Sequence, residues 1–201
     1  MALPGTVMKQ ALCFIPLRWL LAVILAGLLF LLSGCASFRE MTCAQFEENR
    51  KDADYTTQYR FLESDSESAA RNFKTLPKGT SAVVRLYKMR VDTPKIAPCN
   101  YLVLYKEFYL QRKAGKSLAL EEIREFYTAD GALIATKAET LGNQLRTSGY
   151  YTGDTTLPIP EKAPPGKYRI VSKLVLKGKN TSSATLLAKT SVNFQVIARN
   201  K

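Results

Sequence analysis

The chain of 201 residues contains no histidine. This absence excludes Ser-His-Asp and Cys-His nucleophiles, imidazole general bases and histidine-ligated zinc. The Gly-x-Ser-x-Gly elbow, the phosphate-binding loop and the dinucleotide fingerprint are also missing from the sequence. We therefore interpret the protein as a non-enzyme, and we expect no catalytic residue, no metal site and no cofactor.

Carboxylate pairs are a further source of catalysis, because two acids can hydrolyse a glycosidic bond. Glu121 and Glu122, with Glu125 nearby, are one such set. Adjacent acids at the entry of a strand are typical of a solvated edge, and we interpret these three residues in that way.

The sequence also has few long apolar runs, and the one that stands out lies near the N-terminus. Trp19–Leu32 comprises fourteen residues without a charge, preceded by Lys9 and Arg18 and followed by Ser33-Gly34-Cys35. A cationic start, a short apolar core and small residues at the cut are the layout of a secretory signal. A retained membrane anchor and a buried helix are the alternatives, but a spanning helix needs about 20 apolar residues. The initiator is Met1 or Met8.

The sequence Leu32-Ser33-Gly34-Cys35 resembles the lipobox of bacterial lipoprotein precursors. The resemblance implies that residues 1–34 are a cleaved signal peptide and that the thiol of Cys35 carries acyl chains such as palmitate. An aspartate just after the lipidated cysteine commonly retains such proteins in the inner membrane of Gram-negative bacteria. Ala36 and Ser37 stand here instead, so the resemblance implies the outer membrane, facing the periplasm. The inner membrane and the cell surface are the alternatives.

Acidic residues are also scarce. The chain has 29 Lys and Arg against 17 Asp and Glu, and removal of Lys9 and Arg18 with the signal leaves 27 against 17, a net charge of +10. Such an excess favours anionic phospholipid, lipopolysaccharide, acidic glycan or acidic protein, and a solubilising surface is the alternative. We expect no nucleic acid at a lipid-anchored exported protein.

Cysteine is rare as well, with four in the chain. After export, Cys13 leaves with the signal and Cys35 is lipidated, so Cys43 and Cys99 form an even pair in an oxidising compartment. We predict a structural disulfide between them, with two buried free thiols as the alternative. The eight residues from Cys35 to Cys43 reach at most about 27 Å, so the folded domain stays close to the bilayer.

Segments with helical periodicity are short throughout the mature chain. Segments in which apolar and polar residues alternate are more frequent, and turn-forming residues separate them. Thr42–Lys51 predicts a short helix with Thr42 as N-cap and Gln45 in a capping box. The segments that predict strands are 54–62, 81–91, 100–112, 123–140 as a hairpin, 150–152, 167–177 and 184–198. A bulge is expected near Arg85–Lys88, and the hairpin turns at Asp130-Gly131.

These elements predict a mainly β chain, an antiparallel immunoglobulin-like β-sandwich with a short N-terminal helix. Pro165–Ile170 and Val192–Val196 resemble the last two strands of immunoglobulin-like domains in secreted bacterial proteins. The expected organisation is a signal peptide over 1–34, a lipidated tether and short helix over 35–53, and the sandwich over 54–201.

Two surfaces are candidates for partner binding. Period-two alternation places five basic residues on one strand face, which favours an anionic partner: Lys167, Arg169, Lys173, Lys177 and Lys179. A solvated face that guards against aggregation is the alternative. Tyr101, Tyr105 and Tyr109 form an aromatic face suited to sugars or a protein, or else packed beneath other elements.

The expected function is that of a membrane-anchored envelope lipoprotein. It would act as a non-enzymatic binding or assembly-accessory module for an envelope protein partner. The alternatives are a direct binder of anionic glycan or lipid, such as peptidoglycan or lipopolysaccharide, and an enzyme inhibitor or unrecognised hydrolase.

Overall fold

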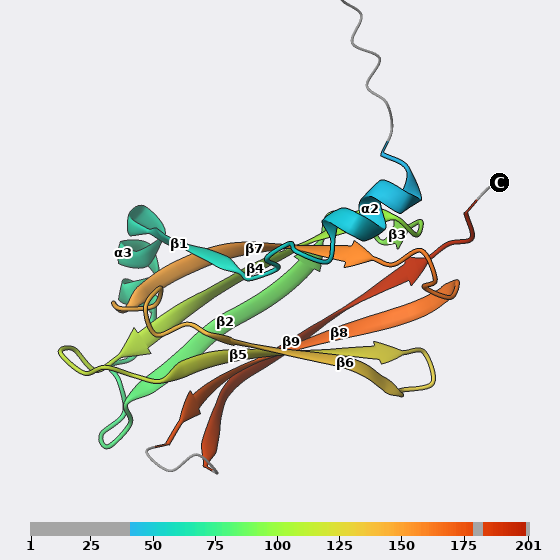
Figure 1. Ribbon diagram of the computed structural model, residues 1–201. Helices are drawn as coiled ribbons and strands as arrows, with labels where there is room; N and C mark the ends of the chain where they lie inside the picture. The colour runs from blue at the N-terminus through green and yellow to red at the C-terminus, as the bar shows by residue number, and fades with distance from the viewer. Residues whose placement is uncertain (1–40, 179–182, 200–201) are drawn as a thin grey trace, which may run out of the picture. The chain divides into compact units, whose positions relative to one another are not determined.

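The computed structural model describes residues 41–178 and 183–199, which form a sandwich of two β-sheets (Figure 1). One sheet has the strand order β1-β7-β4-β2, and the other has the order β3-β9-β8-β5-β6. The strands are β1 (Gln58–Leu62), β2 (Ala82–Val91), β3 (Lys95–Ile96), β4 (Asn100–Arg112), β5 (Leu120–Thr128), β6 (Leu133–Thr140), β7 (Gly149–Ile159), β8 (Gly166–Lys177) and β9 (Ala184–Val196). The predicted mainly β sandwich is confirmed. All pairs are antiparallel except β3 with β9.

The predicted N-terminal helix is present as α2 (Cys43–Asn49). The Thr42 hydroxyl accepts a hydrogen bond from the Gln45 amide at 3.3 Å, and the Gln45 side chain accepts one from the Thr42 amide at 3.0 Å. This reciprocal capping box satisfies two donors that the helix itself leaves without partners. Neither α2 nor the other described helix is long and apolar enough to cross a membrane.

The second helix, α3 (Glu63–Asn72), includes the polar segment 64–68, which lacks the apolar periodicity that predicts a helix. Glu63 and Asp65 lie in its first turn, where the helix dipole favours negative charge. The hydroxyl of Ser66 accepts a hydrogen bond from the backbone amide of Tyr150 at 2.7 Å. This bond fastens the helix to β7.

Two of the local strand predictions are confirmed at their irregular points. The pairing of β2 with β4 shifts between Arg85 and Lys88, where Leu86 has a φ of 57°. Gly131 has a φ of 86° in the turn between β5 and β6, and that conformation is accessible to glycine at little cost. The bulge and the hairpin turn therefore lie at the positions that the sequence predicts.

Strand β7 has eleven residues, whereas the sequence predicts a strand only over 150–152. The prediction is too short because glycine and proline residues in this segment resemble strand breakers. Gly153 lies beneath the Tyr59 ring, and a Cβ at this position would lie 2.6 Å from a ring carbon. Pro158 lies beyond Asp154, where the pairing of β7 with β1 ends. Proline is tolerated where a strand has a neighbour on one side only.

Two apolar clusters fill the space between the sheets. The first consists of Ala82, Phe108, Leu110, Leu118, Leu120, Leu141, Leu145, Tyr151 and Leu174. The second consists of Ile96, Leu102, Leu104, Leu157, Ile159, Ile170, Phe194 and Val196. Between them, polar residues interrupt three strands: Lys106 separates Leu104 from Phe108 on β4, Ser172 separates Ile170 from Leu174 on β8, and Thr155 precedes Leu157 on β7.

Candidate functional site

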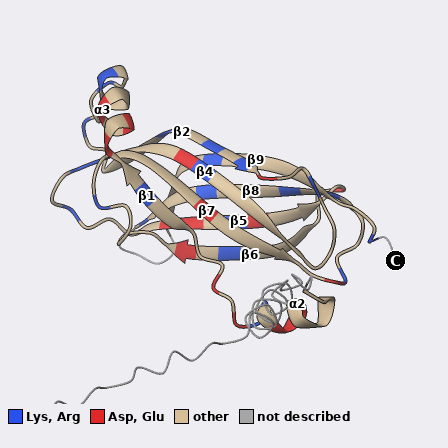
Figure 2. Ribbon diagram, turned by 90° about the horizontal axis from the view of Figure 1, so that it is seen from above, with Lys and Arg blue, Asp and Glu red and all other residues tan. Residues whose placement is uncertain are grey.

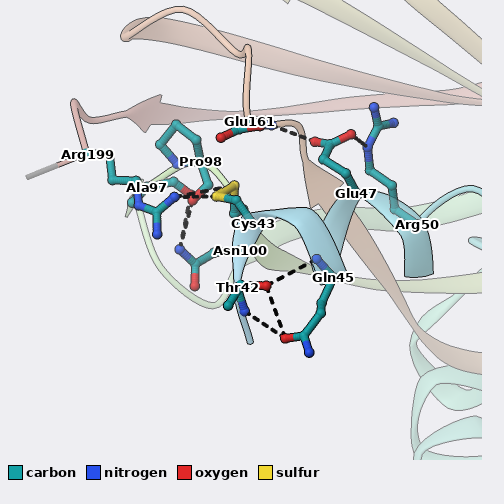
Figure 3. Close-up of a disulfide and its surroundings, with 11 residues drawn as sticks. Thr42, Cys43, Gln45, Glu47, Arg50, Ala97, Pro98, Asn100, Glu161 and Arg199 are labelled. Carbon is teal, nitrogen blue, oxygen red and sulfur yellow. Dashed lines mark hydrogen bonds and ion pairs between the residues drawn. A yellow bond between two sulfur atoms is a disulfide. The ribbon is translucent and has the colours of Figure 1, made fainter. Parts of the chain in front are cut away.

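A disulfide joins Cys43 to Cys99 at one end of the sandwich, with Cα atoms 5.3 Å apart, and confirms the predicted pair. It connects the first turn of α2 to the residue before β4, and Arg199 beyond β9 donates to the sulfur of Cys43 (Figure 3). The Glu47 carboxylate accepts a hydrogen bond from the Glu161 amide at 2.7 Å. Helix α2 is therefore fixed to the loop after β7 as well as to β4. Cys35, the candidate lipid attachment point, lies outside the described residues.

The same end of the sandwich contains the turn between β5 and β6, the start of β8 and the end of β9. Strand β3 joins this end, because the Gln195 amide donates to Pro94 and the Ile197 amide donates to Ile96. The Cys99 amide donates to the carbonyl of Ile159 at 2.9 Å. Helix α2, strand β3 and the turn between β5 and β6 therefore lie at the same end of the sandwich (Figure 1).

Four of the five residues in the predicted basic stripe lie within the described part of β8, and they divide into two pairs. Lys173 contacts Glu125 at 2.5 Å, and Lys177 contacts Glu121 at 2.6 Å. These neighbouring carboxylates on β5 neutralise that half of the stripe. Lys179 lies outside the described residues. Figure 2 shows basic and acidic segments mixed along this sheet rather than one block of positive charge.

The other pair, Lys167 and Arg169, lies at the disulfide end and is exposed. Neither residue belongs to an ion pair among the described residues, and the Arg169 guanidinium lies 5.1 Å from the centre of the Tyr127 ring. A cation over an aromatic face keeps its charge while it is held in position. This half of the predicted stripe is therefore available to an anion.

Lys167 and Arg169 line a cleft of about 590 Å³, together with Lys95 of β3. Asn193 and Gln195 of β9 also line it and offer amide donors. Asp130 is the one acidic residue in the lining, and hydrogen bonds from Thr128 and backbone amides lower the pKa of its carboxyl group. Three cations against one acid make this cleft net positive.

The three predicted tyrosines share the outer face of β4 but do not form an open contact surface. Tyr101 packs against Phe46 of α2, with ring centres 4.7 Å apart. Tyr109 is 4% exposed beneath Phe73, which follows α3. Tyr105 lies under the guanidinium of Arg90 at 4.1 Å. Phe46 of α2, Phe73 after α3 and Arg90 of β2 each cover one ring of the aromatic face.

The interior holds a charged layer that sequence reasoning missed. The Lys106 ammonium donates to both carboxylate oxygens of Glu122, at 2.7 and 2.8 Å, and to the Thr57 hydroxyl at 2.6 Å. The side chains of Lys106 and Glu122 are fully buried. Glu121 and Glu122 are 8% and 0% exposed, so their interpretation as part of a solvated edge was wrong. Lys106, which interrupts the apolar face of β4, was the sequence signal for this layer.

A second ion pair, between Arg124 of β5 and Glu139 of β6, extends the layer. The Arg124 side chain is fully buried, and it also donates to the carbonyl of Tyr55 at 3.0 Å. The Glu139 carboxylate accepts a hydrogen bond from the Thr57 amide at 2.8 Å. The segment before β1 is thus held by backbone groups to both members of this second ion pair, and by the Thr57 hydroxyl to the first pair.

Burial and ion pairing shift the pKa values of Lys106 and Glu122 in opposite directions. Burial lowers the pKa of Lys106 to about 8, against the attraction of Glu122. Burial alone would raise the pKa of Glu122, but the charges of Lys106 and Arg124 and the hydrogen bonds outweigh it and lower that pKa. Both members of the central pair are therefore charged at neutral pH. Because the layer is enclosed, we assign it to the architecture rather than to a binding site.

One trio of potential metal ligands occurs among residues 41–178 and 183–199, formed by Cys43, Cys99 and Glu161. The two sulfur atoms are bonded to each other, and a disulfide does not supply the thiolates that a metal ion requires. This trio therefore does not fit a metal site.

No family model and no curated protein matches the chain. The C-terminal domain of wzt is 9% identical with a TM-score of 0.42, and the match covers 74% of this chain and 81% of that domain. A CARDB domain from Pyrococcus furiosus is 10% identical with a TM-score of 0.35, over 59% and 94% of the two chains. The sporulation control protein Spo0M of Bacillus subtilis is 11% identical with a TM-score of 0.31, over 61% and 51%. With TM-scores below 0.5, these matches assign neither a family nor a function to the chain.

Proposed function

We propose that the protein is a lipid-anchored, non-enzymatic binding module of the bacterial cell envelope, which holds an anionic partner at the membrane surface. The observation that carries the proposal is the cleft of Lys95, Lys167 and Arg169, which lies at the end where the disulfide fastens α2. The lipobox ending at Cys35 lies eight residues before Cys43. A tether of this length keeps the cleft near the bilayer.

The cleft favours an anion over an uncharged protein surface as the partner. Its three cations have no carboxylate partner among the described ion pairs, and Asn193 and Gln195 add neutral donors. Ammonium and guanidinium groups with nearby amides suit phosphate and carboxylate oxygens. Phosphate-bearing lipid headgroups and acidic glycans share this chemistry. The predicted aromatic face, by contrast, is covered by side chains of Phe46, Phe73 and Arg90.

The anchor is tested on the protein isolated from its native envelope. Mass spectrometry is expected to find a chain that begins at Cys35, carries acyl groups on that residue, and holds Cys43 and Cys99 as a disulfide. A chain that retains residues 1–34 and has an unmodified Cys35 would contradict the anchor.

The cleft is tested by two double variants that remove the same number of charges from β8. Lys167→Gln with Arg169→Gln neutralises the unpaired half, and Lys173→Gln with Lys177→Gln neutralises the paired half. The lipidated protein in phosphatidylcholine nanodiscs is titrated with inorganic phosphate, deacylated lipopolysaccharide and peptidoglycan fragments. A charge-assisted hydrogen bond is worth about 1.5 kcal/mol, so the first variant should weaken binding at least about tenfold.

The paired-half variant is expected to change the affinity for the same probes much less. Equal losses in the two variants would show that net charge alone attracts the anions. Absence of binding by every probe would contradict the proposed function.

A further inference from the structure

A second hollow of about 300 Å³ opens beside the cleft, between the two sheets. Its walls come from both layers, with Phe126 of β5, Leu157 and Ile159 of β7, and Phe194 of β9. These side chains belong to the second apolar cluster or pack against it. The hollow is therefore an opening of the apolar core to the outside, and we call it the apolar pocket.

The strand pairing explains why the sandwich is open here. Strand β1 pairs with β7 from Tyr150 to Asp154, so the remainder of β7, from Thr155 to Ile159, has no described strand beyond it. Strand β6 is the edge of the opposite sheet. The side chains of Leu133 and Ile134 on β6 are 54% and 55% exposed, and Ile134 lines the pocket.

The charged residues of the pocket are both cations. Lys137 and Arg169 line it, and no carboxylate does. The ammonium of Lys137 lies 5.8 Å from the centre of the Tyr55 ring and 3.8 Å from the Glu139 carboxylate. An apolar chamber with a cationic rim is complementary to a ligand that has a hydrocarbon part and an anionic part.

The apolar pocket and the cationic cleft share three residues, Tyr168, Arg169 and Phe194. The rings of Tyr168 and Phe194 stack with centres 5.5 Å apart and form part of both walls. A ligand whose head occupies the cleft would therefore have its tail beside the pocket. Arg169 lies where the two parts of such a ligand would join.

We propose that the apolar pocket binds the hydrocarbon chain of a single-chain anionic amphiphile, whose carboxylate or phosphate contacts Arg169. This inference rests on the proposed anion-binding function and names the class of ligand. The walls offer too few hydrogen-bonding groups for a glycan. The volume is at the lower end of the roughly 300–1,000 Å³ of ligand pockets, which suits one chain rather than two.

A series of alkanoates of increasing length, titrated against the lipidated protein in phosphatidylcholine nanodiscs, measures the depth of the pocket. Empty nanodiscs provide the correction for partitioning into the bilayer. Each buried methylene should raise the affinity about fourfold until the pocket is filled, after which the affinity should level off. An affinity that does not depend on chain length, after this correction, would overturn the inference.

Two tryptophan substitutions on β6 provide a matched pair. Ala135 lines the pocket, whereas Ala138 lies on the same strand outside it, and both residues are exposed. Ala135→Trp should obstruct the pocket and weaken dodecanoate binding at least about tenfold, because several methylenes lose their contacts. Ala138→Trp should leave the affinity unchanged. Similar affinities in the two variants would overturn the inference.

The position of the ligand's anionic head group is tested by substituting two arginines, each of which lies over a tyrosine ring. Arg169→Gln should weaken the binding of dodecanoate and dodecyl phosphate but not that of dodecanol. Arg90→Gln, on the other sheet, should affect none of the three ligands. Equal losses for dodecanol and dodecanoate with Arg169→Gln would overturn the assignment of the head to Arg169.

The two proposals can fail separately. If Lys167 and Arg169 govern the binding of soluble anions while Ala135→Trp leaves dodecanoate binding intact, the pocket assignment is overturned and the anion-binding function stands. If Ala135→Trp instead abolishes capture of an envelope protein, the edge of β6 is a protein-docking site, and the amphiphile is overturned. If soluble anions do not bind but chain-length dependence persists, the proposed function fails.

Discussion

The two ends of the sandwich interior differ in how completely they exclude solvent. In the first apolar cluster, every residue except Leu118, at 9%, is at most 3% exposed. In the second, Leu102, Leu104 and Ile170 are 0% exposed, but the residues that line the apolar pocket are 7–8% exposed: Leu157, Ile159 and Phe194. Complete burial gives the larger gain per apolar side chain. We infer that the closed end contributes most to stability, and that the open end keeps surface for a ligand.

The charged layer separates these two ends. A buried ion pair is weak support for stability, because the cost of desolvating both charges can exceed their attraction. Lys106 and Glu122 are nevertheless well satisfied, since Tyr59 donates to Glu122 at 3.0 Å and Ser172 also donates to it. Because each charge is satisfied by the other, we expect the loss of one partner to be far more costly than the loss of both.

The largest expected effect comes from breaking the central pair. Lys106→Met leaves Glu122 buried without its ammonium partner and should lower the free energy of unfolding by about 3–5 kcal/mol. The double variant Lys106→Met with Glu122→Leu should recover most of this loss. Urea denaturation of the purified protein measures the free energy of unfolding of both variants. A double variant as unstable as the single one would contradict this interpretation.

An intermediate effect should distinguish the closed end from the open end. Leu110→Ala and Leu157→Ala remove the same side chain from the first and second clusters. Leucine-to-alanine losses span about 2–5 kcal/mol, so we expect Leu110 near the upper limit and Leu157 near the lower one. The same denaturation experiment measures the difference. Equal losses would show that the pocket does not weaken the second cluster.

The smallest expected effect concerns pH. The pKa of Glu122 is lower in the folded protein than in the unfolded chain, so its ionised form stabilises the fold above the unfolded pKa. That contribution disappears as the pH falls through the folded pKa. The wild-type protein should therefore lose more stability on acidification below pH 4.5, the ordinary value for glutamate, than the double variant at Lys106 and Glu122. Parallel acid profiles of unfolding would exclude Glu122 as a source of acid sensitivity.

Features determined by neighbouring residues could be predicted from the sequence. The Thr42 capping box, the bulge after Arg85 and the turn at Gly131 depend on a few adjacent residues, and all three are confirmed. The disulfide could be predicted from the number of cysteines and their expected compartment. In β7, Gly153 is required by the Tyr59 ring, which is distant in sequence, so the strand was underestimated.

The candidate site depends on contacts between strands, and the sequence indicates it only in part. Alternation placed Lys167 and Lys173 on one face, but it could not reveal that Glu125 of β5 lies beside Lys173 and not beside Lys167. Lys95 reaches the cleft through the two-residue parallel pairing of β3 with β9, which has no periodic pattern. The apolar pocket arises because β1 is short, and only the sheet order shows this.

The disulfide also determines how mechanical load would enter the molecule. A pull on the N-terminal segment reaches Cys43 and passes through the sulfur bridge to Cys99, next to β4, which is an inner strand of its sheet. The bridge spans a sequence separation of 56 residues, a stretch that includes β1, α3, β2 and β3. Tension therefore bypasses those elements, and a pull on the N-terminal segment would not peel them from the sandwich one by one.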